Sequence, residues 1–313
     1  LTYEQKVKLA DMLAARQFTK LEAHFEGWQR RYERREIDDW ALLVQYQGFY
    51  HDSAGGTEKH DAWVKAFPKS YHARLARGIH HRKAGERERG SAWYNDTPQE
   101  NIDALHERLD LARADLIASL NLTPRPVVSL VHLMNITKHR EGDQGNRMWL
   151  DASLKVDPIS YGARRRYMYT LAPRWGGSFE EMEAFLSDCK RANLPPAHLQ
   201  TYEAIIVLEL AHVLRLEKRD DQVLSAHRRV IALLKGVDNL ELLDSLRAVV
   251  ASALRRNRLH GAARGVDEVL RISPDDESML GYRGWIAEHH GRHDDAWADY
   301  LRAAEMGNAW SQY

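Results

Sequence analysis

The sequence predicts an all-α fold, an α-solenoid of stacked antiparallel helical hairpins. Three observations predict it: internal repeats with a 34-residue period, helix-start signals, and apolar residues at helical spacing. Residues 257–262 align with residues 291–296, and residues 116–124 align with residues 150–158, with five of those nine positions identical. A hairpin of this length cannot bury its apolar face alone, so we expect neighbouring hairpins to share a continuous core.

The N-terminal elements begin with an aromatic helix. Leu21, Phe25, Trp28 and Tyr32 recur at helical spacing and predict one buried stripe. Capping residues predict the starts of five helices in this half of the chain: Thr2, Thr19 with Glu22, Asp38, Ser70, and Thr97 with Glu100.

Proline and glycine mark the later elements. Pro124, Pro158 and Pro274 occupy matching places after outer helices, where proline prevents continuation. Ser178 with Glu181 predicts a capping box, and Pro195–Pro196 predicts the start of a long helix that ends at about Leu216. Asp220 or Asp221 predicts the cap of the next helix, which ends at Gly236. The small residues Ala262, Gly284, Ala296 and Ala303 predict sites of close helix contact.

The amino-acid composition limits the classes of function that the chain can have. The 313 residues carry 45 Lys+Arg and 45 Asp+Glu, and this balance disfavours a dedicated nucleic-acid binder. A single cysteine, Cys189, fits a reducing compartment, and no apolar run reaches the length of a membrane span. We therefore expect a cytoplasmic protein. The start at Leu1 and the end at Tyr313 lead us to expect either a trimmed chain or a piece of a longer protein.

Two family resemblances follow from these residues. The run Leu171-x-Pro173-Arg174-Trp175-Gly176-Gly177-Ser178-x-Glu180-x-Met182-x-x-Phe185 resembles the signature of a bacterial family of unknown function. That resemblance would cover residues 1–235 and implies no chemistry. Residues 236–313 resemble tetratricopeptide repeats, and the turn through Gly307–Asn308–Ala309 is similar to the related Sel1 type. We expect these two segments to be domains that continue into one another.

Histidine clusters raise the alternative of a metal-dependent hydrolase. His289 and His293 have ligand spacing, but Gly291 lies in the turn between them. His51–Asp52 and His60–Asp61 resemble paired metal ligands, but they flank a Gly-Gly loop. No phosphate loop or nucleophile elbow is present in the sequence. We therefore predict no catalytic residue, no metal and no cofactor.

The binding candidates come from the repeat register. Inner-face positions of the first helix in each hairpin are Arg247, Tyr282, Trp285, His289, Asn135 and Lys138. A second candidate is a cationic–aromatic patch formed by Arg164, Arg165, Tyr169 and Arg174, for which a solvated helix face is the alternative. Trp175 is expected to be a wedge between helices, or else an exposed partner anchor.

These candidates predict a non-catalytic module that binds a protein or peptide, as an adaptor or as an inhibitor of a bacterial effector. The hydrolase and an RNA-binding helical repeat are the alternatives.

Overall fold

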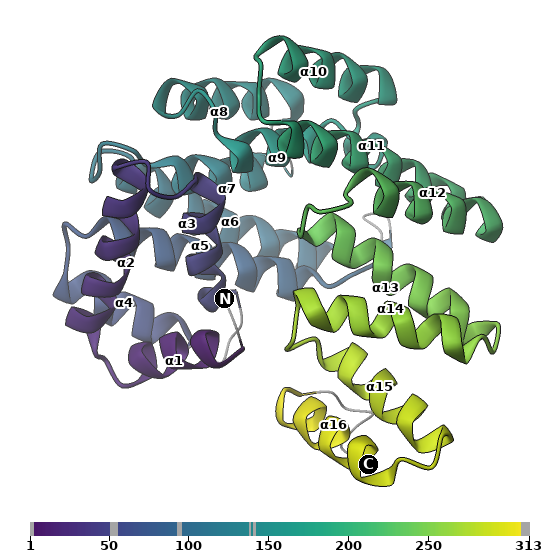
Figure 1. Cartoon of the computed structure of the whole chain (residues 1–313). Coiled ribbons are helices and arrows are strands. Elements are labelled where there is room, and N and C mark those ends of the chain that lie inside the picture. Colours follow the sequence, from purple (N-terminus) through teal and green to yellow (C-terminus); the bar gives the residue numbers. More distant parts are fainter. Residues whose placement is uncertain (1–2, 51–55, 93–95, 138, 140–141, 308–313) are drawn as a thin grey trace. The chain divides into compact units, whose positions relative to one another are not determined.

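The structure is a computed structural model that describes residues 3–50, 56–92, 96–137, 139 and 142–307. Within these residues the chain forms sixteen α-helices and no β-strand, which confirms the all-α helical-repeat prediction (Figure 1). The helices belong to two compact units, residues 1–171 and residues 172–313. In the described part of the chain, no helix has both the length and the apolar character needed to cross a membrane.

The first unit consists of nine α-helices and a short 3₁₀ helix. Their bounds are α1 Tyr3–Ala14, α2 Phe18–Glu33, α3 Asp39–Gln45, η1 Tyr46–Phe49, α4 Gly56–Ala66, α5 Tyr71–Arg89, α6 Gln99–Ser119, α7 Val127–Thr137, α8 Gly142–Val156 and α9 Tyr161–Thr170. The long helices α5 and α6 form one hairpin, and α7 and α8 form the next. The 34-residue match lies on these hairpins, because Leu116 of α6 and Leu150 of α8 are both buried core residues.

The aromatic stripe of α2 forms part of this unit's core. Leu21, Phe25 and Tyr32 are buried, as predicted, and the Phe25 ring stacks on Tyr46 with 4.5 Å between ring centroids. Trp28 is only partly buried and lies under the Arg31 guanidinium, 4.6 Å from ring centroid to Cζ. The stripe therefore has three core positions rather than four.

Side-chain caps are confirmed at three predicted helix starts. Asp38, Ser70 and Ser178 accept hydrogen bonds from the backbone N–H of the residue three positions later. The predicted caps at Thr19, at Thr97 and at Asp220 or Asp221 are wrong, because the N-cap residues there are Gln17, Pro98 and Arg219. Thr2 lies outside the described residues.

Tight turns explain two of these errors. Arg16 and Lys218 adopt left-handed φ values of 55° and 59°, and the next residue becomes the N-cap. Asn257 and Gly291 do the same before α14 and α16. A residue with a left-handed backbone conformation turns the chain sharply at a single position, so the next helix begins directly after it without a side-chain cap.

The second unit is a series of helical hairpins. Its elements are η4 Pro173–Trp175, α10 Phe179–Arg191, α11 Pro196–Leu216, α12 Asp220–Leu233, α13 Leu240–Arg255, α14 Leu259–Ile272, α15 Glu277–His289 and α16 His293–Glu305. The pairs α11–α12, α13–α14 and α15–α16 are hairpins, and each contacts the next. One hydrophobic cluster extends from Ala204 in α11 to Ala303 in α16.

Small residues allow the close helix contacts that the sequence predicts. Ala262, Gly284, Ala296 and Ala303 are all buried. A Cβ added at Gly284 would lie 2.8 Å from the Tyr300 ring, so α15 and α16 are too close there for any larger residue.

Candidate functional site

Arg247 of α13 lies between two acidic side chains. Its Nε donates to Asp276 at 2.7 Å, and another guanidinium nitrogen donates to Asp244 at 2.9 Å. Asp276 is buried and is the N-cap of α15, where it also accepts from the Met279 backbone N–H. Arg247 therefore links α13 to the start of α15, and its charge is already neutralised in this fold.

Tyr282, Trp285 and His289 share one side of α15, as the helical spacing predicts. Tyr282 and Trp285 are partly buried and pack against the hydrophobic cluster of the second unit. The His289 ring lies 4.0 Å from the Trp285 ring, and its Nδ1 lies 2.9 Å from the Trp285 carbonyl oxygen. His289 is exposed, so this side of α15 keeps an accessible edge.

Asn135 is not at an accessible surface. It is buried in α7, and its amide donates to the Val131 carbonyl oxygen at 3.2 Å. Every residue of α7 is buried, because neighbouring helices cover it on all sides. The assignment of Asn135 to an open inner face is therefore wrong. Lys138 lies outside the described residues.

The cationic–aromatic patch is mostly internal. Arg164 is buried and donates to the carbonyl oxygens of Pro158 and Ser160. Arg165 is buried with its Cζ 4.6 Å from the Trp40 ring centroid and 5.2 Å from that of Tyr169. These arginines cannot form a solvated groove, because their heads lie against protein.

Arg174 and Trp175 follow this segment in the second unit. The Arg174 Nε lies 3.1 Å from the buried Glu209 carboxylate. Trp175 is 42% exposed, so the expectation of a buried wedge is wrong. Gly176 makes the turn with φ 91°, which leaves the ring at the surface.

The histidines that the structure describes do not come together as a metal centre. Within the described residues, no group of three or more His, Cys, Asp or Glu side chains could hold a metal ion. His289 and His293 are on different helices, and His60 is buried against the His80 ring. The pair His51–Asp52 lies outside the described residues.

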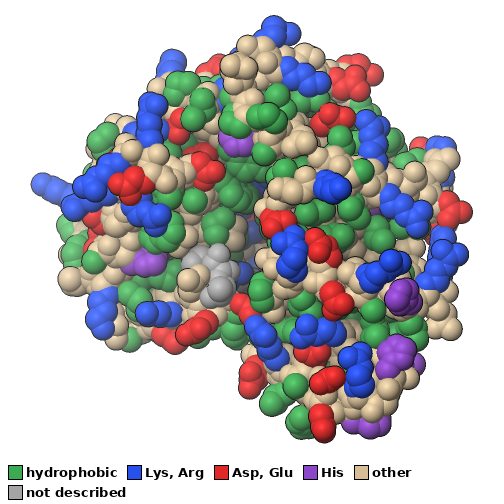
Figure 2. All heavy atoms as spheres, viewed as in Figure 1, with side chains coloured by type: hydrophobic (Ala, Val, Ile, Leu, Met, Phe, Trp, Pro, Cys, Tyr) green, Lys and Arg blue, Asp and Glu red, His purple; other side chains and the backbone are tan. Residues whose placement is uncertain are grey.

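Charged side chains of both signs are mixed on the face of the molecule that Figure 2 shows. In Figure 2, basic and acidic residues alternate on the visible face. Ion pairs join side chains of opposite charge in the second unit, such as Arg271 with Asp238 at 2.9 Å and Arg302 with Asp275 at 2.7 Å. Mixed charge offers no broad positive track for a nucleic-acid backbone on this face.

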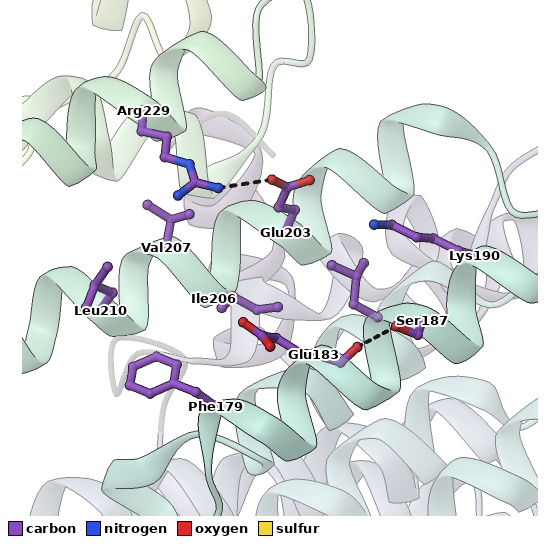
Figure 3. A pocket seen from close by; sticks show the side chains of 10 residues that line it. Phe179, Glu183, Ser187, Lys190, Glu203, Ile206, Val207, Leu210 and Arg229 are labelled. Atoms are coloured by element: carbon purple, nitrogen blue, oxygen red, sulfur yellow. Dashed lines mark hydrogen bonds and ion pairs between the residues drawn. The ribbon is translucent and has the colours of Figure 1, made fainter.

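A groove in the second unit was not identified from the sequence. It lies between α10 and α11, beside α12, with a volume of about 450 Å³. Phe179 and Leu186 of α10 and Ile206, Val207 and Leu210 of α11 form its apolar wall (Figure 3). Leu210 at the end of this wall is 40% exposed, so the groove is open to solvent there.

Polar residues border this groove. Glu203 of α11 pairs with Arg229 of α12 at 3.3 Å, and Glu183 and Lys190 lie along α10 (Figure 3). The sequence held a signal, because Ile205–Ile206 and Val207 place apolar side chains on more than one face of α11. Such a helix is either wholly buried or offers a second apolar face to a partner.

The chain resembles solved helical-repeat structures only remotely. It aligns with the TPR domain of P58(IPK) at 15% identity and a TM-score of 0.34, covering 98% of this chain and 94% of that one. It aligns with the apo form of the quorum sensor NprR from B. thuringiensis at 12% identity and a TM-score of 0.38, covering 99% and 94%. At these TM-scores neither alignment carries an argument about function. No curated protein matches the chain.

A family match is more informative. The family described as "Domain of unknown function (DUF4034)" matches residues 5–140 and 136–198. Together these segments contain more than half of the sequence. The expected membership in a family of unknown function is thereby confirmed, whereas the Trp-Gly-Gly turn as its signature stays a prediction. The chain belongs to the DUF4034 family.

Proposed function

We propose that this chain is a non-catalytic helical-repeat module that binds a protein or peptide segment in the groove between α10 and α11. The observation that carries the proposal is the apolar lining of this groove, in which Phe179 and Ile206 are partly exposed and Leu210 is 40% exposed. Covering apolar surface contributes about 25 cal/mol per Å² removed from water. A partner with a matching apolar face therefore gains free energy from this groove.

The groove suits an amphipathic helix. Its apolar wall runs along two neighbouring helices, and the charged side chains of Glu183, Lys190, Glu203 and Arg229 lie among and beside the apolar ones. A helical segment would present anchors at positions i, i+3 or i+4, and i+7 to such a wall. Its polar face would meet Glu183 and Lys190, which carry opposite charges.

Leu210→Asp tests the groove, with Leu216→Asp as the matched control. Both leucines are exposed on α11, but only Leu210 lines the groove. Helical peptides selected from a random library on the purified chain should share apolar anchors at helical spacing. Leu210→Asp should weaken their affinity about tenfold or more, because it buries a charge against apolar atoms. Fluorescence anisotropy measures this loss.

The Leu216→Asp control separates loss of the groove from a general effect of the added charge. Leu216→Asp should bind the same peptides with unchanged affinity, and both variants should keep the helical circular dichroism spectrum. If Leu210→Asp binds normally, the groove is not the site. The variant Trp285→Ala then tests the exposed edge of α15, where Tyr282, Trp285 and His289 remain predicted contacts.

The proposal extends to the biological role of the chain. Binding by shape and charge complementarity would suit an adaptor or an inhibitor of a cognate bacterial effector in the cytoplasm. A photocrosslinking residue at position 210, compared with the same residue at position 216, would capture the native partner in cells. A partner captured equally from both positions would argue against the groove.

A further inference from the structure

A cluster of cationic side chains surrounds Tyr50 in the first unit, separate from the proposed groove. Arg82 and Lys83 come from α5, and their charged atoms lie 5.8 Å and 4.8 Å from the Tyr50 ring centroid. The ring of His132 from α7 approaches the same ring edge-on, with 6.2 Å between centroids. Arg166 of α9 completes the group, because its charge acts on both Tyr50 and His132.

Several polar atoms in this cluster have no partner. His132 is 1% exposed, yet neither of its ring nitrogens has a hydrogen bond. The Nε atoms of Arg82 and Arg166 are also buried without an acceptor, and Arg82 is 4% exposed. An unsatisfied buried donor costs about 1–3 kcal/mol, so a ligand that supplied acceptors to these groups would gain free energy from each of them.

The cluster also carries excess positive charge. Among the described residues, Glu86 is the carboxylate that pairs with it, contacting Arg82 and, at 2.9 Å, Lys83. The cluster therefore has three cations, Arg82, Lys83 and Arg166, and one anion, Glu86, which gives it a net charge of two positive units.

The ionisation of the cluster reflects this excess. Burial, together with the neighbouring charges of Arg165 and Arg82, lowers the pKa of Arg166 to about 10. Burial, with the charges of Arg82, Arg166 and Lys83, holds the pKa of His132 well below its usual range. His132 is therefore a neutral imidazole that can both donate and accept a hydrogen bond.

One side of the cluster is open to solvent. Lys83 keeps 26% of its side chain exposed, and Tyr50 and Arg166 are partly exposed. Arg82 and His132 form the buried end.

We propose that the Tyr50 cluster binds a phosphate group, either free or as part of a small phosphate monoester. A phosphate monoester carries about −1.5 to −2 charge at pH 7, which matches the two excess positive charges. A tetrahedral phosphate offers enough acceptor oxygens for the Nε–H groups of Arg82 and Arg166 and the ammonium of Lys83. The neutral His132 can donate one more hydrogen bond from the buried end.

The experiment is calorimetric titration of the full chain with inorganic phosphate and with glycerol 3-phosphate. Chloride and acetate at the same ionic strength are the reference anions. We expect both phosphates to bind with a Kd below about 1 mM and acetate to bind at least tenfold more weakly. Tighter binding of glycerol 3-phosphate than of inorganic phosphate assigns the site to an ester.

Lys83→Met is the test variant, and Lys65→Met, an exposed lysine of α4, is its matched control. Lys83→Met should weaken phosphate binding about tenfold or more, because a charge-assisted contact is lost. In phosphate-free buffer its Tm should equal or exceed that of the parent, because repulsion from Arg82 and Arg166 is relieved. Lys65→Met should bind phosphate normally.

Three results would overturn the proposal. The first is no phosphate binding beyond that of chloride, and the second is acetate binding as tight as phosphate. The third is a Lys83→Met variant that loses stability in phosphate-free buffer and binds phosphate as the parent does, which would make the lysine structural.

Discussion

Buried histidines of α4 and α5 lose their charge in this fold. His60 is fully buried, its ring stacks on that of His80 with 4.4 Å between centroids, and its Nδ1 lies 3.1 Å from the Gly56 carbonyl oxygen. Burial, and next the proximity of His80, lower the pKa of His60 to about 3. The unfolded chain therefore binds a proton at His60 near pH 6.5 that the folded chain refuses.

This difference makes stability depend on pH. Because the folded pKa lies below the unfolded one, stability is lost as the pH falls from about 6.5 towards 3. Between pH 7.5 and 4.5, His60 alone should remove about 2–3 kcal/mol from the free energy of unfolding. His60→Gln should reduce this loss by a similar amount in urea denaturation. His290→Gln, at an exposed position, should leave the pH dependence unchanged; equal slopes in both variants would contradict the assignment.

At the scale of the helix pair, glycines set the distance between α5 and α6. A Cβ added at Gly85 would lie 2.8 Å from the Arg108 Cβ and 3.2 Å from the Leu105 carbonyl oxygen. Gly78, two turns earlier, faces Leu116 at 3.0 Å. Arg77 joins the same helices through two hydrogen bonds of 2.7 Å to the buried Asp115.

Gly85→Ala should therefore destabilise the protein although alanine favours helix. The overpacking cost of about 1–3 kcal/mol exceeds a helix-propensity gain of at most about 1 kcal/mol. Gly27→Ala, in the middle of α2, is the control because its Cβ would have no neighbour within 4 Å. That change should raise stability by about 0.5–1 kcal/mol. Chemical denaturation separates the two outcomes, and a stabilised Gly85→Ala would show that α6 can move away.

At the scale of the molecule, the hairpins of the second unit share one core. Val207 of α11, Val250 of α13 and Val266 of α14 are buried members of the same hydrophobic cluster. In a stack of repeats, stability is a sum of each repeat and its interfaces with neighbours. A cavity in one hairpin should therefore weaken the hairpins on both sides.

Val250→Ala tests this coupling. It should cost about 2 kcal/mol and accelerate amide hydrogen exchange in α11 and α12 as well as in α13 and α14. Leu301→Ala, at a position of α16 that is 51% exposed, is the control and should alter exchange little. Faster exchange confined to α13 would mean that the hairpins unfold independently. The predicted domain boundary at residue 235 stays a prediction, and the same exchange data test it.

The sequence by itself determined the architecture of this protein. The 34-residue period, the helical spacing of apolar residues and the positions of proline can all be identified along the chain, because every hairpin must bury one apolar face. Caps at Asp38, Ser70 and Ser178 were likewise readable, since each depends on residues three positions apart.

Only the tertiary structure decided which side chains are available to a partner. Arg164, Arg165 and Asn135 looked like surface residues, but all three are buried, and the Arg165 guanidinium lies over Trp40 of the distant helix α3. The Arg247 guanidinium donates a hydrogen bond to Asp276, which comes from the next hairpin. The groove along Leu210 and the cluster around Tyr50 also assemble from separate helices. Exposure and charge pairing are properties of packed neighbours, and residue spacing along one helix does not specify them.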